Sequence, residues 1–303
     1  EAVMSVLVVG TTALDSIKTP HRENPRLLGG SASHAAVAAS FFSPTRLVGV
    51  VGHDFPEDYI DLYKRHGLEL DCLERADGPT FYWSGEYEIN MNNRRTLETE
   101  LGVIENFNPQ LTDAAKQSKY VLLANCAPGL QHHVLKQVEN PSFVVVDTMD
   151  LWLNIAREEL LELLKNVDCL VLNDSEAHIF TEEDSAVIAT KALHAAGPKY
   201  VIVKKGEHGA ILSTPNGYFI APAYPLENLV DPTGAGDSFV GGLMGYLASH
   251  EGADIETRLR KGIIYGTVAA SFCCEDFGLH RTTQATREEI DGRLNELHTM
   301  TTY

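Results

Sequence analysis

The sequence has few basic residues for its size. It carries 24 Lys and Arg residues against 42 Asp and Glu residues, which gives a formal net charge of −18. Proteins that bind long polyanions need a basic face to release counterions, so this deficit argues against nucleic acid as a partner. A small anionic ligand remains compatible with it, because such a ligand needs only a few local donors.

The sequence also lacks the features of membrane proteins and of disulfide-bonded proteins. No apolar run approaches the ~20 residues needed to cross a bilayer. The apolar run in the first ten residues is short and is typical of a first strand rather than a signal peptide. The five cysteines are odd in number and form no C-x-x-C pair: Cys72, Cys126, Cys169, Cys273 and Cys274. We therefore expect reduced, mostly buried thiols, no zinc site, no membrane partner and a cytoplasmic location.

The chain is long enough and apolar enough to bury a large core. It has 303 residues, of which 44% are apolar and 22% charged, close to the average for globular proteins. No internal repeat, low-complexity tract or linker divides it. We therefore expect a single α/β domain over residues 1–303.

Short β-branched runs alternate with helical stretches. Strands are predicted at residues 5–10, 45–51, 120–124, 143–147, 169–172 and 200–203, and helices at 31–42, 56–66, 130–138, 151–164 and 185–196. The strands are nearly continuous in apolar residues, as parallel strands covered on both faces should be. A hairpin at 209–213 and 218–221 follows, then helices at 235–249, 255–274 and 287–298. This order predicts three layers, with helices on both sides of a mainly parallel sheet.

Two segments interrupt this alternation. Residues 11–28 are polar and contain two prolines, and residues 68–103 include period-two stretches such as 80–89. Both are predicted to form strands of a small sheet inserted into the α/β body as a lid. Two long surface loops are the alternative, although loops of that length are uncommon unless they bind ligands or cover a site.

The strongest chemical signal is the run from Asp231 to Asp237, D-P-T-G-A-G-D, which precedes a helix rich in small residues. Amides of Gly234, Ala235 and Gly236 at a helix N-terminus would be free to bind an anion, helped by the helix dipole. Asp237, in the first turn, could act as general base toward an alcohol. An anion hole beside a base is the minimum needed for phosphoryl transfer to a hydroxyl.

The extended run resembles the D-T-x-G-A-G-D signature of the ribokinase-like (PfkB) carbohydrate kinase family. The resemblance implies a three-layer αβα ribokinase-like fold with a small β-sheet lid. This sequence departs from the signature at Pro232, which stands where the family often has Thr. A proline there removes one N–H donor, but we expect the amides of the anion hole to be unaffected.

The resemblance extends to the acceptor side of the site. Asp15 follows the first strand at the offset where the family has an Asp that binds sugar hydroxyls. Gly29 and Gly30 resemble the family's di-glycine element, although a turn with a Ser N-cap explains them equally well. His34 stands where the family usually has an Asn that contacts the substrate. The hydroxyl pattern that this chain accepts could therefore differ.

Further residues resemble the family's nucleotide side. Asn173 and Glu176 match an N-x-x-E element that orders Mg²⁺ through water, or they simply cap the next helix. Lys204, Gly206 and Gly209 match a K-x-G-x-x-G turn near the nucleotide phosphates, or form an exposed hairpin with solvated lysines. Thr233 and Gly236 are also assigned to nucleotide binding. Asp231 lies where some members of the family bind a monovalent cation such as K⁺.

The function implied is an ATP- and Mg²⁺-dependent kinase for a primary hydroxyl of a small sugar or nucleoside. Stacking of Phe81, Tyr82 and Trp83 on a base would favour a nucleoside, but these residues could equally be core of the small sheet. Arg94 or Arg95 could reach phosphate from the lid, and family lids often form a homodimer interface. A catalytically silent binding protein on the same fold is the alternative from another class.

Overall fold

The computed structural model describes residues 4–91 and 94–302, and its centre is a sheet of nine strands. From edge to edge these are β13 (Gly217–Ala221), β12 (Ala210–Thr214), β11 (Tyr200–Lys204), β10 (Cys169–Asn173), β9 (Phe143–Asp147), β8 (Tyr120–Leu123), β1 (Val6–Val9), β4 (Thr45–Val51) and β5 (Glu69–Arg75). Every neighbouring pair is parallel except those that β12 makes with β11 and β13. The predicted parallel strands and the predicted hairpin are confirmed.

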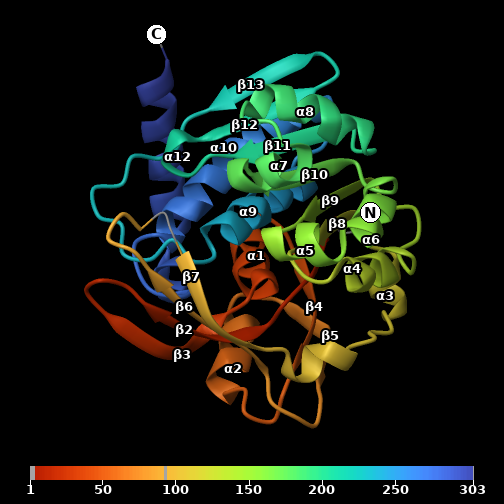
Figure 1. Cartoon of the computed structure of the whole chain (residues 1–303), viewed down its shortest axis with the longest axis vertical. Coiled ribbons are helices and arrows are strands. Elements are labelled where there is room, and N and C mark those ends of the chain that lie inside the picture. Colours follow the sequence, from red (N-terminus) through yellow and green to blue (C-terminus); the bar gives the residue numbers. More distant parts are fainter. Residues whose placement is uncertain (1–3, 92–93, 303) are drawn as a thin grey trace.

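Helices cover both faces of this sheet, as Figure 1 shows. On one face, Val6 and Val8 pack with α1 (Ser31–Ser40), α2 (Glu57–Arg65), α9 (Ala235–Ser249) and α10 (Ile255–Cys273). On the other, Leu7 and Val9 pack with α3 (Asp113–Lys116), α4 (Pro128–Leu135), α6 (Arg157–Leu164), α7 (Asp174–Thr181) and α8 (Ala186–Ala195). Alternate residues of one strand thus serve two cores, which explains why the strands show no period-two pattern.

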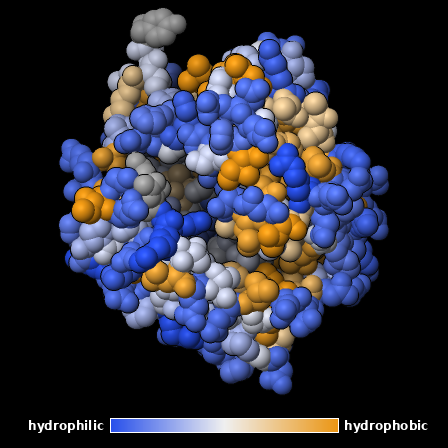
Figure 2. All heavy atoms as spheres, viewed as in Figure 1, coloured by the Kyte–Doolittle hydropathy of each residue, from blue (hydrophilic) through white to orange (hydrophobic). Residues whose placement is uncertain are grey.

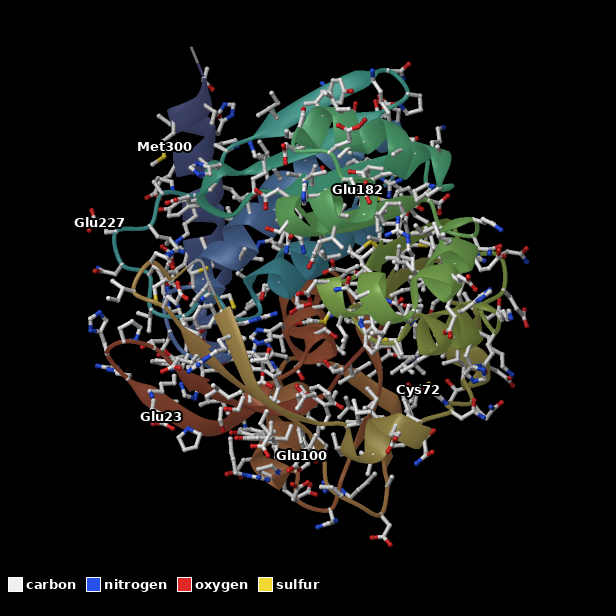
Figure 3. All side chains as sticks on the ribbon, viewed as in Figure 1. Glu23, Cys72, Glu100, Glu182, Glu227 and Met300 are labelled. Atoms are coloured by element: carbon white, nitrogen blue, oxygen red, sulfur yellow. The ribbon has the colours of Figure 1, made fainter. Side chains whose placement is uncertain are left out.

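The small sheet is also present, with strand order β3 (Glu23–Gly29), β2 (Ala13–Lys18), β6 (Phe81–Tyr87) and β7 (Arg94–Glu100). It lies at the lower left of Figure 1, beside α1. Glu23 and Glu100, on its two edge strands, are exposed (Figure 3). The prediction that residues 68–103 belong to this sheet was wrong for β5, which pairs with β4 at the edge of the large sheet.

Other differences concern helices. The single helix predicted at 151–164 is two helices, α5 (Asp150–Ile155) and α6, separated at Ala156, whose φ is −136°. The helix α7 and the short helix α11 (His280–Gln284) were not predicted, whereas α12 (Arg287–Thr301) was. Four cysteines are buried and Cys274 is half-buried, all with free thiols. Within residues 4–91 and 94–302, no helix is both long and apolar enough to span a membrane.

Candidate active site

A cavity of about 910 Å³ opens between the small sheet, α1, α5 and the start of α9. Figure 2 shows this face of the molecule hollowed near its centre. Six of the residues assigned from the sequence line the cavity: Asp15, Gly30, His34, Thr233, Gly234 and Asp237. The structure therefore brings Asp15 and Asp237, which are far apart in the sequence, to the same cavity.

Asp237 occupies the first turn of α9, as its motif predicted. The residue is half-buried, and the loss of solvent around its carboxyl raises the pKa from 3.8 to about 7. The carboxylate of Asp147 acts in the same direction. Lys204 and Arg94 act in the opposite direction on this pKa. A carboxyl that titrates near neutrality is suited to accept a proton from an alcohol.

The amides before Asp237 are not all free. The Ala235 N–H donates to the Pro232 carbonyl at 3.1 Å, so the prediction of a three-amide hole does not hold for Ala235 in this structure. The amides of Gly234 and Gly236 have no hydrogen-bond partner within the described part of the chain. Gly234 has φ 81°, and a Cβ there would lie 2.3 Å from Cε1 of His34. Only glycine therefore fits at this position.

Asp15 lies on β2, beside Trp83 of β6. A Cβ on Gly29 would come within 1.9 Å of Oδ2 of Asp15, so this glycine makes room for the carboxylate. Burial raises the pKa of Asp15 to about 7, against the effect of a hydrogen bond from the Gly30 backbone. Gly29 thus acts through Asp15 and does not line the cavity itself.

His34 is 1% exposed and projects from α1 against Gly234. Burial lowers its pKa to about 4, so the imidazole is neutral at physiological pH. Its Nδ1 lies 3.7 Å from the Cys273 thiol, and its Nε2 has no partner within residues 4–91 and 94–302. A neutral imidazole with a free nitrogen can exchange one hydrogen bond with a ligand in the cavity.

Of the residues assigned to the nucleotide, Thr233 lines this cavity and the others lie outside it. Asn173, Glu176, Lys204, Gly206 and Gly209 are absent from its lining. Asn173 and Glu176 form a capping box for α7: the Glu176 N–H donates to Asn173 Oδ1 at 2.8 Å, and the Asn173 N–H donates to Glu176 Oε2 at 2.7 Å. The capping interpretation is therefore confirmed for this pair.

Lys204 has a partner that the sequence analysis missed. Its ammonium lies 3.4 Å from the carboxylate of Asp147, which is 3% exposed at the end of β9. A Cβ on Gly236 would lie 2.9 Å from Nζ of Lys204, so the charge sits beside the start of α9. The signal for Asp147 was available, because it ends a predicted strand and ligands bind at the carboxyl ends of such strands.

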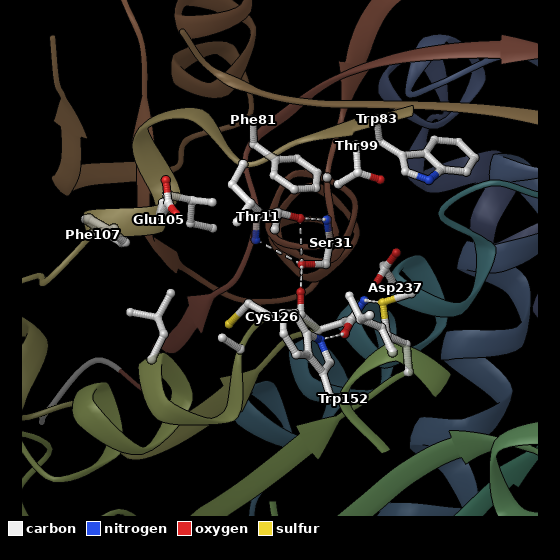
Figure 4. Close-up of a pocket in the computed structure, with 18 of the residues that line it drawn as sticks. Thr11, Ser31, Phe81, Trp83, Thr99, Glu105, Phe107, Cys126, Trp152 and Asp237 are labelled. Carbon is white, nitrogen blue, oxygen red and sulfur yellow. Dashed lines mark hydrogen bonds between the residues drawn. The ribbon is translucent and has the colours of Figure 1, made fainter. Parts of the chain in front are cut away.

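Aromatic side chains form much of the cavity wall. Phe81 and Trp83 line it, whereas Tyr82 packs against the core on the other side of β6. Trp152 of α5 faces them from the opposite side (Figure 4), and its Nε1 donates to Oδ1 of Asn125 at 2.9 Å. Neither Trp152 nor Asn125 was singled out from the sequence.

The two adjacent arginines of β7 differ in direction. Arg94 lines the cavity, with its guanidinium 5.2 Å from the centre of the Trp83 ring. Arg95 pairs with Glu86 at 2.6 Å. Arg94 is therefore the arginine that can reach a ligand. The cavity lining contains none of the basic residues at the start of the β3 region, which are His21, Arg22 and Arg26. Arg26 instead pairs with Asp54 at 2.7 Å.

Asp231 is fully buried at the start of the motif loop. Its Oδ1 accepts from the Thr233 N–H at 2.9 Å, and its Oδ2 has no hydrogen-bond partner within the described residues. Burial raises the pKa of this carboxyl. Across residues 4–91 and 94–302, no three His, Cys, Asp or Glu side chains gather as a metal site.

This fold, with its site at the carboxyl ends of parallel strands, is that of the ribokinase-like kinases. The chain belongs to the pfkB family of carbohydrate kinases, whose pattern it matches over residues 5–285. It is 26% identical to a cytidine kinase of Thermococcus kodakarensis, over 86% of this chain and 94% of the relative. It is 27% identical to a nucleoside kinase of Thermoplasma acidophilum, over 83% and 79% of the two chains.

Solved structures show the same fold. The nucleoside kinase of Methanocaldococcus jannaschii superposes with a TM-score of 0.78 at 22% identity, covering 97% of this chain and 98% of the other. That of Burkholderia thailandensis in complex with inosine has a TM-score of 0.77 at 22% identity, with 96% of each chain covered. Family membership makes this protein a phosphotransferase that acts on a sugar or a nucleoside.

Proposed function

We propose that this protein transfers the γ-phosphoryl group of ATP to a primary hydroxyl of a nucleoside. The observation that carries the proposal is the half-buried Asp237 carboxyl on the cavity wall, next in the chain to the amides of Gly234 and Gly236, which have no partner within the described residues. This arrangement supports a base and an anion hole that act on one acceptor hydroxyl.

In the proposed reaction, the carboxylate of Asp237 takes the proton of the acceptor hydroxyl. The hydroxyl oxygen forms a bond to the γ-phosphorus, and the bond from that phosphorus to the bridging oxygen breaks, so that ADP leaves. The amides of Gly234 and Gly236 stabilise the negative charge on the transferring oxygens. Because the amides are neutral, this binding of phosphate needs no basic surface, which reconciles it with a net charge of −18.

The acceptor would lie between the small sheet and α5. Asp15 would accept hydrogen bonds from ring hydroxyls, the Gly30 backbone would approach them closely, and the free nitrogen of His34 would contribute one more bond. The rings of Phe81 and Trp152, on opposite walls, suit a flat base between them. The relatives named as cytidine and nucleoside kinases support the same acceptor class.

For the nucleotide, Lys204 lies beside the start of α9, where a γ-phosphate would lie, and Thr233, just before that helix, lines the cavity. Gly206 and Gly209, with φ of 55° and 83°, would shape the turn after β11 that carries the rest of ATP. A solved neighbour, the ribokinase of Arabidopsis thaliana, is complexed with ribose and ATP.

Asn173 and Glu176 are the proposed Mg²⁺ residues. Their capping box uses one oxygen of each side chain and leaves Oε1 of Glu176 for a water ligand of the ion, so a hydrated Mg²⁺ fits. Mg²⁺ there would neutralise phosphate charge. The unpartnered Oδ2 of Asp231 fits a monovalent cation such as K⁺ in the same way.

The small sheet is proposed to act as a lid that excludes water, and as the contact of a homodimer. The strand β7 supports the second role, because it is an edge strand whose seven residues are all exposed. The mass of the protein in solution tests it, and a monomer that retains full activity would contradict it.

A sugar such as ribose or fructose is the second candidate acceptor, since the hydroxyl-binding residues serve either class. The decisive experiment measures ATP-dependent phosphorylation of a panel of nucleosides and free sugars, with product identification. A nucleoside 5′-phosphate supports the proposal, and phosphorylation of free sugars alone favours the second candidate. Acceptor binding without any acceptor-dependent turnover would identify a catalytically silent binding protein.

A further inference from the structure

A direct link joins the small sheet to the loop that carries the anion hole. Tyr87, the last residue of β6, places its phenolic oxygen 2.9 Å from Oγ1 of Thr233, 146 residues away in the sequence. Its ring is 7% exposed and packs with Ile17 and Leu27 of the small sheet and with Phe277. The contact is therefore held from the side of the small sheet by a well-packed aromatic ring.

Three hydrogen bonds hold Thr233 in place. Its N–H donates to Asp231 within the same loop at 2.9 Å, and its carbonyl accepts from the Cys273 thiol at the end of α10 at 3.2 Å. The third bond is the one to Tyr87. Among the bonds to Thr233 in the described residues, this is the one that comes from the small sheet. The amide of Gly234, which is proposed to bind phosphate, follows immediately in the chain.

The same strand forms a wall of the acceptor cavity. Phe81 and Trp83, six and four residues before Tyr87, both line it. An acceptor that contacts these rings therefore contacts the strand whose far end holds Thr233. The register of β6 with β7 shifts between Ser84 and Gly85, whereas its pairing with β2 is unbroken from Phe81 to Glu86. The pairing with β2 therefore links the two ends of the strand.

We propose that Tyr87 is a positioning residue, whose hydrogen bond to Thr233 couples the acceptor-bound position of the small sheet to the geometry of the anion-hole loop. The inference rests on the proposed function, in which that loop binds the transferring phosphoryl group. Tyr87 touches neither reactant. Its effect is to make phosphoryl transfer efficient only when the acceptor has set the position of β6, which limits transfer to water.

The phenol is suited to this role at every physiological pH. Burial raises the pKa of Tyr87 to about 12, so the hydroxyl keeps its proton. Removing that hydroxyl leaves the Oγ1 of Thr233 without this partner and loosens the loop. The loss of one such bond corresponds to about a tenfold change in an equilibrium or rate.

The test is the Tyr87→Phe variant, which removes the hydroxyl and keeps the packed ring. We expect kcat for acceptor phosphorylation to fall about tenfold, while KM for the acceptor stays within twofold. The ratio of ATP hydrolysed to acceptor phosphorylated should rise. Tyr82→Phe is the matched control, because Tyr82 is on the same strand but packs against the core away from the cavity, and it should match the wild type in all three quantities.

A double-mutant cycle checks that the effect passes through Thr233. Thr233→Val should lose activity by itself, and adding Tyr87→Phe to it should cause little further loss, whereas Thr233→Ser keeps the hydroxyl and should restore the effect of Tyr87. Additive losses in Tyr87→Phe and Thr233→Val would overturn the inference.

Hydrogen exchange gives a readout that does not depend on activity. The hydrogen-bonded amides of Thr233, Ala235 and Ser238 should exchange about tenfold faster in Tyr87→Phe than in Tyr82→Phe. An active wild type, with Tyr87→Phe unchanged in kcat, hydrolysis ratio and exchange, overturns this inference alone. A wild type without acceptor-dependent turnover overturns the proposed function and this inference with it.

Discussion

On the side of the small sheet, the polar groups of the site face a cavity, whereas at the ends of β10 and β11 they face one another. Asp15, His34 and Gly234 line a space of about 910 Å³. In contrast, Asn173 pairs with Glu176 and Lys204 pairs with Asp147. Under the proposed function, the acceptor half is thus already open to a ligand, whereas Lys204 in the nucleotide half already has a carboxylate partner. Substitutions in the acceptor half should therefore reduce activity more than substitutions in the nucleotide half.

The largest contrast is expected between Asp237 and Asp147. Asp237→Asn removes the proposed base, and we expect kcat to fall about a thousandfold, within the usual range for general acid–base catalysis. Asp147→Asn removes the partner of Lys204 and should lower kcat about tenfold, because it alters only the position of a cation. Steady-state kinetics with acceptor and ATP measure both. Equal losses would show that the two halves do not differ as proposed.

Gly29 and Gly206 allow the two halves to be compared by adding one methyl group to each. Gly29→Ala places a Cβ 1.9 Å from Oδ2 of Asp15, so we expect kcat/KM for the acceptor to fall about a hundredfold. A Cβ on Gly206 meets no atom within 4 Å, although φ is 55°, so Gly206→Ala should cost only about 1 kcal/mol of strain. Acceptor kinetics and thermal unfolding distinguish the two. If the Gly29→Ala protein bound its acceptor with wild-type affinity, Asp15 would not be an acceptor-binding residue.

The two halves are electrostatically joined, and pH should reveal it. Because the pKa of Asp237 is raised to about 7, kcat should rise with pH below 7 and level off above, as the base loses its proton. The charge of Asp147 contributes to that rise, so Asp147→Asn should move the midpoint to lower pH. The control is Asp184→Asn, which changes the net charge equally at a side chain that is 100% exposed. An identical midpoint in all three proteins would contradict this coupling.

The same carboxyls also predict how stability depends on pH. The pKa values of Asp15 and Asp237 rise from 3.8 to about 7, so the folded protein holds protons that the unfolded chain has released. Their contribution is fully present below pH 3.8 and is lost as pH rises through about 7. The midpoint of thermal unfolding should fall over this interval, and Asp15→Asn should flatten the fall.

Elements buried in the core could be predicted from the sequence, whereas exposed elements and long-range contacts could not. The buried central strands showed continuous apolar runs, and the start of α9 at Ala235 was marked by its glycines. The edge strand β5 was misassigned because only Cys72 of its seven residues is buried, so its pattern resembled the small sheet. The break at Ala156 had no signal, since neither glycine nor proline occurs there. The ion pair between Asp147 and Lys204 had no local signal, because it joins residues 57 positions apart.

The smallest effect is expected from the two arginines of β7, which differ only in direction. Arg94→Ala should lower kcat about fivefold, because an exposed guanidinium near Asp15 and Asp237 contributes a modest, screened interaction. Arg95→Ala should leave kcat unchanged, since Arg95 pairs with Glu86 outside the cavity. High salt should shrink the effect of Arg94→Ala, because screening already weakens the interaction that it removes. If Arg95→Ala lowered kcat more than Arg94→Ala, Arg95 rather than Arg94 would face the acceptor in the working enzyme, which would contradict this prediction.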